Sequence, residues 1–184
     1  MSKLELSAEQ RAALDRPVWS ALTTGHRAFA EGAAQARRYP AAIAPFAAMS
    51  DDSDAAWSEL ADLANEDVVA IVTPAPPGDV RGLDARLRAS VRQMVAVGAV
   101  DPARDAAVEV LDQPDIPAML ELTALTKPGP FLARTHELGR YIGIRDGGAW
   151  PPWPGSACAS TGSRKSARSV SIRTIAASAM PRGS

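Results

Sequence analysis

Apolar residues recur at helical spacing in three stretches of the N-terminal half. Ser7 followed by Gln10 is a capping-box pattern, so a short helix is expected there until Pro17 interrupts it. A second helix is expected after Pro17 and continues towards Phe29. A third helix follows the capping residues at 51–53. Its apolar positions are Ala56, Trp57, Leu60 and Leu63.

Other apolar stretches of this half predict strands. Residues 41–49 are apolar but contain Pro45, which suits an edge strand or an extended segment better than a helix. Residues 66–73 include the run Val-Val-Ala-Ile-Val, and a Pro-rich stretch follows, as expected for a buried strand. Residues 91–97 and 106–111 are two further strand candidates.

The second half begins with a strong helix signal. Asp112 next to Pro114 opens a helix, and the Lys-Pro-Gly-Pro run at 127–130 closes it. The apolar residues of this helix are Ile116, Met119, Leu120, Leu122 and Leu125. Strands and helices in this mixture predict an α/β chain with a mixed sheet.

A short strand follows. Residues 135–140 predict one helical turn, which leads into a strand at Tyr141–Ile144. The Asp-Gly-Gly sequence at 146–148 is a hairpin signal. The partner strand should begin near residue 149, where the chain instead reads Ala-Trp-Pro-Pro-Trp-Pro-Gly.

Composition and charge limit the function classes. A chain of 184 residues, 46% hydrophobic and 22% charged, is globular in composition and excludes a collagen, a disulfide miniprotein and a membrane bundle. The 20 basic and 21 acidic side chains give a net charge of −1, which attracts neither nucleic acid nor anionic lipid along the whole chain. The stretch 149–184 differs, because it holds five basic residues and no acid. Its Ser-, Pro- and Arg-rich sequence predicts a low-order tail rather than a nucleic-acid arm, although Trp150 and Trp153 accompany the cations.

Cysteine usage and the N-terminus predict a cytoplasmic protein. Cys158 is the only cysteine, so an intramolecular disulfide and a multi-cysteine zinc site are excluded. The N-terminus lacks the apolar core of a signal peptide, and no run approaches the roughly 18 apolar residues of a membrane span. The acidic residues 51–54 lack the glycine and glutamate of a calcium loop, so no metal site is expected.

The order of elements over 106–148 resembles the opening of the GNAT N-acetyltransferase superfamily. The run at 125–148, Leu-Thr-Lys-Pro-Gly-Pro-Phe-Leu-Ala-Arg-Thr-His-Glu-Leu-Gly-Arg-Tyr-Ile-Gly-Ile-Arg-Asp-Gly-Gly, is similar to one bacterial subfamily. The resemblance implies acetyl transfer from acetyl-CoA to a small amine or a peptide amine. It also implies three parts: a divergent N-terminal α/β half at 1–103, the first strands and helices of a GNAT-like domain at 104–148, and the tail at 149–184.

The tail departs from the family pattern. In the family, a loop with the motif Arg/Gln-x-x-Gly-x-Gly/Ala brings backbone N–H groups to the cofactor pyrophosphate. No such motif follows Gly148. Residues 148–182 can be written as degenerate codons and read again in a frame shifted by one base. The residues that this second frame permits include a strand, a turn, a second strand and the motif Arg-Gly-Leu-Gly-Tyr-Ala. We therefore interpret the chain as a C-terminally truncated or frameshifted member with impaired activity.

The candidate site residues lie between 131 and 141. His136 is a candidate general base because imidazole titrates near neutrality, and Glu137 is a second candidate. Phe131, Arg134 and Tyr141 lie where the family's acceptor site is walled, so the resemblance implies that they face the substrate. The alternative is that Phe131 and Tyr141 are packed aromatics. The sequence does not establish the catalytic residue, and it identifies no acetyl-CoA-binding residue.

A second hypothesis belongs to another class of protein. The chain would be a non-enzymatic remnant or a partner-binding module, whose strand at Tyr141–Ile144 is unpaired. Another chain could complete that strand edge, as in a homodimer.

Overall fold

The computed structural model describes residues 6–65, 67–75, 77, 80–95, 108–144, 159–160 and 168–179. The chain divides into two compact units. Unit 1 comprises Met1–Pro40, Pro45–Val97 and Ala167–Ser184, and unit 2 comprises Ala41–Ala44 and Gly98–Ser166. Both units contain helices and strands, which confirms the predicted mixed α/β fold class.

Unit 1 begins with two short helices, of which the first is confirmed and the second is shorter than predicted. Its described elements, in chain order, are α1 (Ala8–Asp15), α2 (Pro17–Thr23), η1 (Arg27–Phe29), β1 (Glu31–Gly32), β2 (Ala36–Arg38), β3 (Phe46–Met49), α3 (Asp54–Ala64), β4 (Val68–Thr73), β5 (Leu83–Val95) and β9 (Arg168–Ala179). The capping box at Ser7 is present and starts α1. α2 ends at Thr23 because two threonines and Gly25, all weak helix formers, follow each other there.

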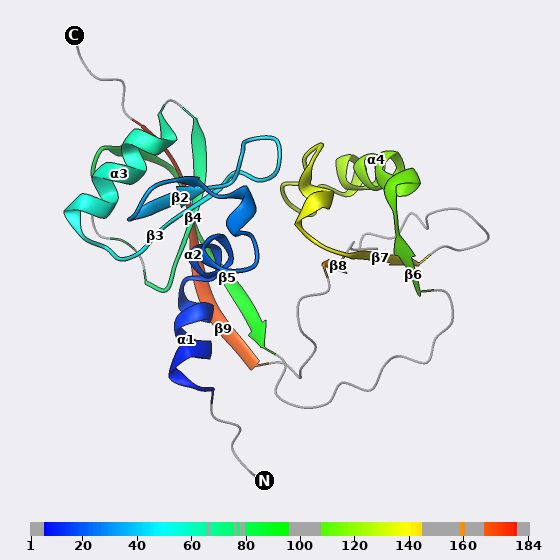
Figure 1. Ribbon diagram of the computed structural model, residues 1–184, viewed down its shortest axis with the longest axis horizontal. Helices are drawn as coiled ribbons and strands as arrows, with labels where there is room; N and C mark the ends of the chain where they lie inside the picture. Colours follow the sequence, from blue (N-terminus) through cyan, green and yellow to red (C-terminus); the bar gives the residue numbers. More distant parts are fainter. Residues whose placement is uncertain are drawn as a thin grey trace. The chain divides into compact units, whose positions relative to one another are not determined.

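The strands of unit 1 form one sheet in the order β1-β2-β3-β4-β9-β5 (Figure 1). Neighbouring strands pair antiparallel except β3 and β4, which are parallel. β3 therefore lies inside the sheet, so of the two alternatives for residues 41–49, an edge strand or an extended segment, the edge strand is wrong. Pro45 is compatible with this position because it precedes β3, where its missing N–H is not needed, while its carbonyl accepts a hydrogen bond from the Ala70 N–H.

Two further strands of this sheet show how well the apolar pattern predicted them. β4 confirms the predicted strand: Val69 is 2% exposed, whereas Val68 on the opposite face is 46% exposed. β5 begins at Leu83, well before the predicted residue 91. Charged residues alternate with apolar ones in its first part, which is the pattern of a strand with one polar face.

The core of unit 1 lies between α3 and the sheet (Figure 1). α3 confirms the helix predicted after residues 51–53, and Ser53 caps it by accepting a hydrogen bond from the Ala56 N–H. Its buried residues recur every three or four positions and so form one face. The buried core residues are Ala36, Ala47, Met49, Ala56, Trp57, Leu60, Ala64, Val69, Ile71, Val80 and Leu83.

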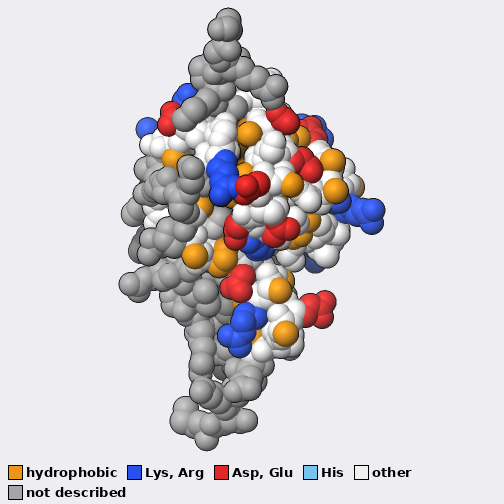
Figure 2. Space-filling view, turned by 90° about the vertical axis from the view of Figure 1, so that its left-hand side faces the viewer, with side chains coloured by type: hydrophobic (Ala, Val, Ile, Leu, Met, Phe, Trp, Pro, Cys, Tyr) orange, Lys and Arg blue, Asp and Glu red, His pale blue; other side chains and the backbone are white. Residues whose placement is uncertain are grey.

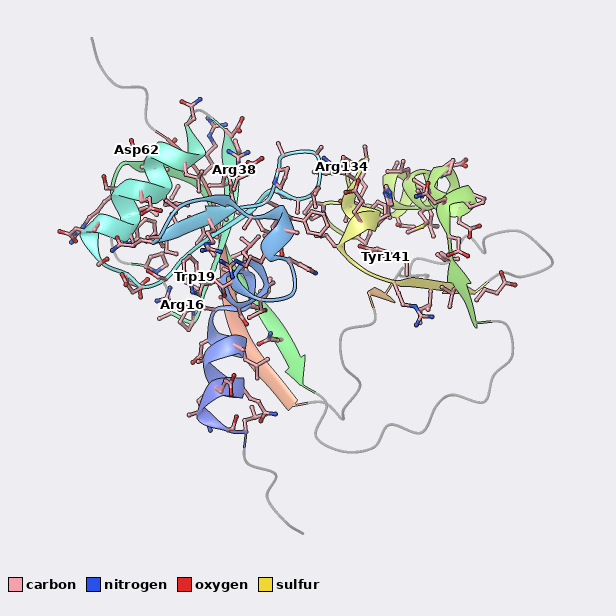
Figure 3. The ribbon with its side chains drawn as sticks, in the orientation of Figure 1. Arg16, Trp19, Arg38, Asp62, Arg134 and Tyr141 are labelled. Carbon is pink, nitrogen blue, oxygen red and sulfur yellow. The ribbon has the colours of Figure 1, made fainter. Side chains whose placement is uncertain are left out.

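Charged side chains of unit 1 form ion pairs with one another within the fold. Arg38, labelled in Figure 3, is 9% exposed and forms an ion pair of 2.9 Å with Asp67. It also donates to the Leu63 carbonyl, so this buried cation is compensated. Arg16 pairs with Asp52 at 2.7 Å. On the face in Figure 2, the acidic and basic side chains of the described residues are interspersed rather than gathered by sign.

Unit 2 confirms the predicted helix and helical turn. Its described elements are β6 (Val108–Leu111), η2 (Gln113–Asp115), α4 (Ile116–Thr126), η3 (Thr135–Leu138), β7 (Tyr141–Ile144) and β8 (Ala159–Ser160). The strands form a sheet in the order β6-β7-β8, and both pairs are antiparallel. Tyr141 pairs with Leu111 on one side and Ser160 on the other. The expectation of an unpaired strand at Tyr141–Ile144 is therefore wrong, because β7 is the central strand.

Several predictions fall outside the described residues. They are the boundary near residue 103, the hairpin turn at 146–148 and most of the low-order tail at 149–184. Within 149–184 the structure describes β8 and β9, and β9 pairs with β4 and β5. Low order and a frameshift origin of the tail stay predictions. No helix in the described part of the chain is long and apolar enough to cross a membrane.

Candidate functional site

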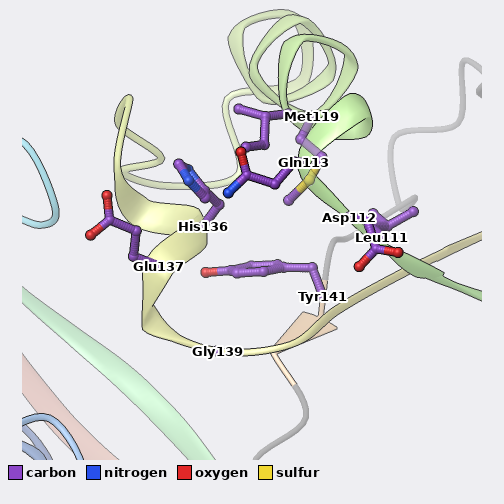
Figure 4. Close-up of a pocket in the computed structure, with 9 residues that line it drawn as sticks. Leu111, Asp112, Gln113, Met119, His136, Glu137, Gly139 and Tyr141 are labelled. Carbon is purple, nitrogen blue, oxygen red and sulfur yellow. The ribbon is translucent and has the colours of Figure 1, made fainter.

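A cavity of about 260 Å³ in unit 2 is bounded by β6, η2, α4, η3 and β7 (Figure 4). Its lining residues are Leu111, Asp112, Gln113, Ile116, Met119, His136, Glu137, Gly139 and Tyr141. One part of the wall is apolar, and the other carries two carboxylates, an amide and an imidazole. No Lys or Arg is among these lining residues. The cavity therefore combines an apolar wall with hydrogen-bonding and titratable groups, as small-molecule sites do.

The 3₁₀ helix η3 positions both candidate bases. A single short 3₁₀ helix is not stable by itself, so its place depends on contacts with other segments. Thr135 is 7% exposed, and its hydroxyl donates to the Ile43 carbonyl. The Arg134 N–H donates to the Ala42 carbonyl at 3.1 Å. The segment Ala41–Ala44, which belongs to unit 2, therefore supports η3 directly.

His136 presents a ring nitrogen without a partner. Its Nδ1 is buried and has no hydrogen-bond partner among the described residues, and the ring lines the cavity (Figure 4). Buried polar atoms normally have a partner, so an unpaired nitrogen on a ring that lines a cavity is a candidate for contact with a ligand. An imidazole nitrogen in this position can accept a hydrogen bond or a proton.

Glu137 is held by Arg134. The Arg134 Nε and Nη2 lie 2.6 and 2.8 Å from the two carboxylate oxygens of Glu137. These hydrogen bonds, together with the guanidinium charge, lower the pKa of Glu137 below its ordinary value. A carboxylate that is both ionised and occupied is a weak base at neutral pH. The geometry therefore favours His136 over Glu137 as the group that takes a proton.

The two predicted aromatic residues pack against each other. The rings of Phe131 and Tyr141 are edge to face, with centroids 5.6 Å apart, and they form a cluster with Leu111 and Met119. Tyr141 is 7% exposed, and its hydroxyl donates to the Thr135 carbonyl at 3.0 Å. Both residues thus have the packing role given as the alternative, and Tyr141 lines the cavity as well.

The structure brings part of the predicted site together. His136, Glu137 and Tyr141 line one cavity, whereas Phe131 and Arg134 are not among its lining residues. A substrate-facing role of the last two stays a prediction. The sequence analysis missed six lining residues: Asp112, Gln113, Leu111, Ile116, Met119 and Gly139. A signal for the first two was present, because they directly follow a predicted strand, and strand ends commonly carry site residues.

The other histidine has a partner. His26 in unit 1 has its Nδ1 2.7 Å from the Tyr39 hydroxyl, and Phe29 packs edge-on against its ring. The described residues contain no group of three or more His, Cys, Asp or Glu side chains that could hold a metal ion.

Comparisons with known proteins bear on the fold. No family model and no curated protein matches the chain. Among solved structures, it matches the crystal structure of a Novosphingobium aromaticivorans protein assigned to the GNAT family as an acetyltransferase. The match has a TM-score of 0.73 and 22% sequence identity, and it covers 91% of this chain and 99% of that chain. The likeness is thus one of fold over most of the chain. This protein has the GNAT fold that its sequence resemblance implied.

Proposed function

We propose that this chain is a GNAT-type acyltransferase, which transfers an acetyl group from acetyl-CoA to an amine, and that loss of the CoA-binding loop impairs its activity. The acceptor, a small amine or a peptide amine, binds in the unit 2 cavity. One observation carries the proposal: His136, a residue that lines a cavity in a chain with the GNAT fold, has a buried Nδ1 without a hydrogen-bond partner among the described residues.

On the acceptor side, the cavity supplies a base and a binding surface. An amine nitrogen that becomes an amide loses a proton. His136 Nδ1 accepts a hydrogen bond from the amine N–H and takes that proton. The apolar wall, which includes Met119 and the Tyr141 ring, packs against the hydrocarbon part of the acceptor. Asp112 adds negative charge at the wall, whereas the charge of Glu137 is compensated by Arg134.

The described residues do not fit acetyl-CoA. Its pyrophosphate needs successive backbone N–H groups at a helix N-terminus. The start of η2 and α4 has prolines at 114 and 117, which lack an N–H, and Asp112 and Asp115, which repel phosphate. α3 follows the acidic residues 51–52 and is equally unsuitable. We therefore expect weak acetyl-CoA binding.

Two measurements on the chain test this proposal. Thiol release from acetyl-CoA in the presence of a panel of amines should exceed the uncatalysed rate, though weakly. His136→Gln should abolish that excess, whereas His26→Gln, in the other unit, should preserve it. Calorimetry should show no saturation by acetyl-CoA at micromolar concentration. Micromolar saturation would overturn the impairment, and complete absence of transfer would overturn the acyltransferase assignment.

The origin of the tail is tested separately. A bacterial source, a cytoplasmic location and a frameshift within 149–184 are part of the proposal. Sequencing of the source DNA through and beyond the codon of Ser184 decides the frameshift. If neither frame encodes the remaining helix and strands of the fold, the frameshift is wrong.

A second candidate function is partner binding at a strand edge. β7 cannot accept another strand beside Tyr141, because β6 and β8 occupy both sides. β6 is an end strand in the described part of its sheet, and Val110 on it is 47% exposed. A homodimer through this edge predicts twice the monomer mass in light scattering after size exclusion. A monomer at all concentrations contradicts this second function.

A further inference from the structure

Thr135 joins three segments of unit 2 through its own polar atoms. Its hydroxyl oxygen accepts a hydrogen bond from the Leu132 N–H at 2.8 Å and donates to the Ile43 carbonyl. Its carbonyl accepts from the Tyr141 hydroxyl at 3.0 Å. The loop before η3, the segment 41–44 and strand β7 therefore meet at one buried residue.

This arrangement matters because η3 has little stability of its own. It is one four-residue turn of 3₁₀ helix, so its orientation follows from what holds it. Ile43, whose carbonyl holds Thr135, is fully buried. Tyr141 is a wall of the cavity, and His136 directly follows Thr135 in the chain. Two lining side chains from two different elements thus share one anchor.

We propose that Thr135 is the positioning residue of the candidate site: it fixes the orientation of η3 and thereby places the His136 ring at the cavity wall. The catalytic meaning of this placement rests on the proposed function, since His136 is the base there. The placement itself does not, because it exists in the free protein. Valine has nearly the shape of threonine but can make neither hydroxyl hydrogen bond, so Thr135→Val removes the side-chain hydrogen bonds to two of the three segments and leaves only backbone hydrogen bonds to them.

The experiment records imidazole resonances by NMR in the free protein. The chain has two histidines, and the spectrum of His26→Gln assigns both. Thr135→Val should move the His136 resonances by more than a linewidth and leave those of His26 unchanged. Thr135→Ser keeps the hydroxyl and should restore the wild-type positions. The matched control is Thr123→Val, because Thr123 is 9% exposed and its hydroxyl donates only to carbonyls of its own helix, those of Met119 and Leu120.

Unchanged His136 resonances in folded Thr135→Val overturn the proposal, as does an equal shift in Thr123→Val. If Thr135→Val does not fold, Tyr141→Phe removes the hydrogen bond to the Thr135 carbonyl and keeps the aromatic ring. A selective shift of His136 in that variant supports the proposal, and its absence rejects it. Acetyl transfer is measured separately: a shifted His136 signal without any transfer leaves the positioning role intact and rejects the proposed function.

Discussion

Arg134, which directly precedes the short helix that carries His136, donates hydrogen bonds to both carboxylate oxygens of Glu137. These two hydrogen bonds occupy the acceptor atoms of Glu137 and lower the pKa of its carboxyl. The residue next to the candidate base therefore stays an anion throughout the pH range in which a histidine titrates. Of these two adjacent side chains, Glu137 has both carboxylate oxygens occupied, whereas the Nδ1 of His136 has no hydrogen-bond partner among the described residues.

Replacing Arg134 should raise the pKa of the Glu137 carboxyl. In Arg134→Gln, the pKa of Glu137 should rise towards the ordinary value of about 4.3. Because the folded-state pKa is depressed in the wild type, the ion pair stabilises above the unfolded pKa, and this contribution is lost as the pH falls through the folded pKa. A ¹³C NMR titration of the glutamate carboxyls measures the change. Arg11→Gln, in unit 1, is the control, and an unchanged Glu137 midpoint in Arg134→Gln contradicts the prediction.

Strand β1 should require glycine at its last position, Gly32. Gly32 has a φ of 111°, and a Cβ there would collide with the Ala36 carbonyl oxygen and lie 2.8 Å from Leu63 Cδ2. Gly32→Ala should therefore lower the free energy of unfolding by at least about 1–2 kcal/mol. Gly25→Ala is the matched control, since a Cβ there meets nothing within 4 Å, and its effect should stay within about 0.5 kcal/mol. Urea denaturation compares the two, and equal midpoints would refute the argument.

The fold was predictable where the local pattern agrees with the tertiary environment. α3 combines a serine cap with an apolar face, so its bounds differ little from the prediction. β3 was placed wrongly as an edge strand because the sequence cannot show whether Pro45 lies inside a strand or just before it. The start of β5 was missed because only the apolar run from Val91 was taken as a strand signal, although charged residues such as Arg86 alternate with apolar ones before it. Pairing between distant strands decides both cases.

The candidate site was predictable by residue type but not by geometry. His136 and Glu137 were chosen for their chemistry, and they do line a cavity. Only Glu137 has its acceptor atoms occupied, because Arg134 donates hydrogen bonds to both of them. The sequence spacing of Arg134 and Glu137 alone does not establish these hydrogen bonds. The support from Ile43 was invisible in the sequence, because 92 positions separate it from Thr135. Long-range contacts of this kind determine which candidate is free to act.

Truncation of two adjacent valines of β4 should lower the free energy of unfolding by different amounts, because only one of them is buried. Val69 is 2% exposed in the core of unit 1, whereas Val68 is 46% exposed. Val69→Ala removes two buried methyl groups, so it should lower the free energy of unfolding by about 2 kcal/mol. Val68→Ala makes the same chemical change and should cost less than about 0.5 kcal/mol. Chemical denaturation followed by tryptophan fluorescence measures both, and similar losses would show that β4 does not bury the predicted face.

Tyr39 should titrate well above an ordinary tyrosine. It is 5% exposed, and burial raises its pKa to about 12. Its hydroxyl also lies 2.7 Å from His26 Nδ1. The chain has two tyrosines, so Tyr141→Phe isolates Tyr39 in an absorbance titration of phenolate.

The sign of the associated stability change follows from that shift. Because the folded state disfavours the phenolate, the contribution of Tyr39 to stability is complete below the unfolded pKa of about 10 and is lost as the pH rises through about 12. Circular dichroism on the same samples must therefore show native signal between these two values while Tyr39 is still protonated. His26→Gln removes the imidazole partner of Tyr39, leaves the phenol buried and should keep its midpoint above 10. A midpoint near 10 in a folded sample would mean that the phenol is solvated, and the buried position of Tyr39 would then be wrong.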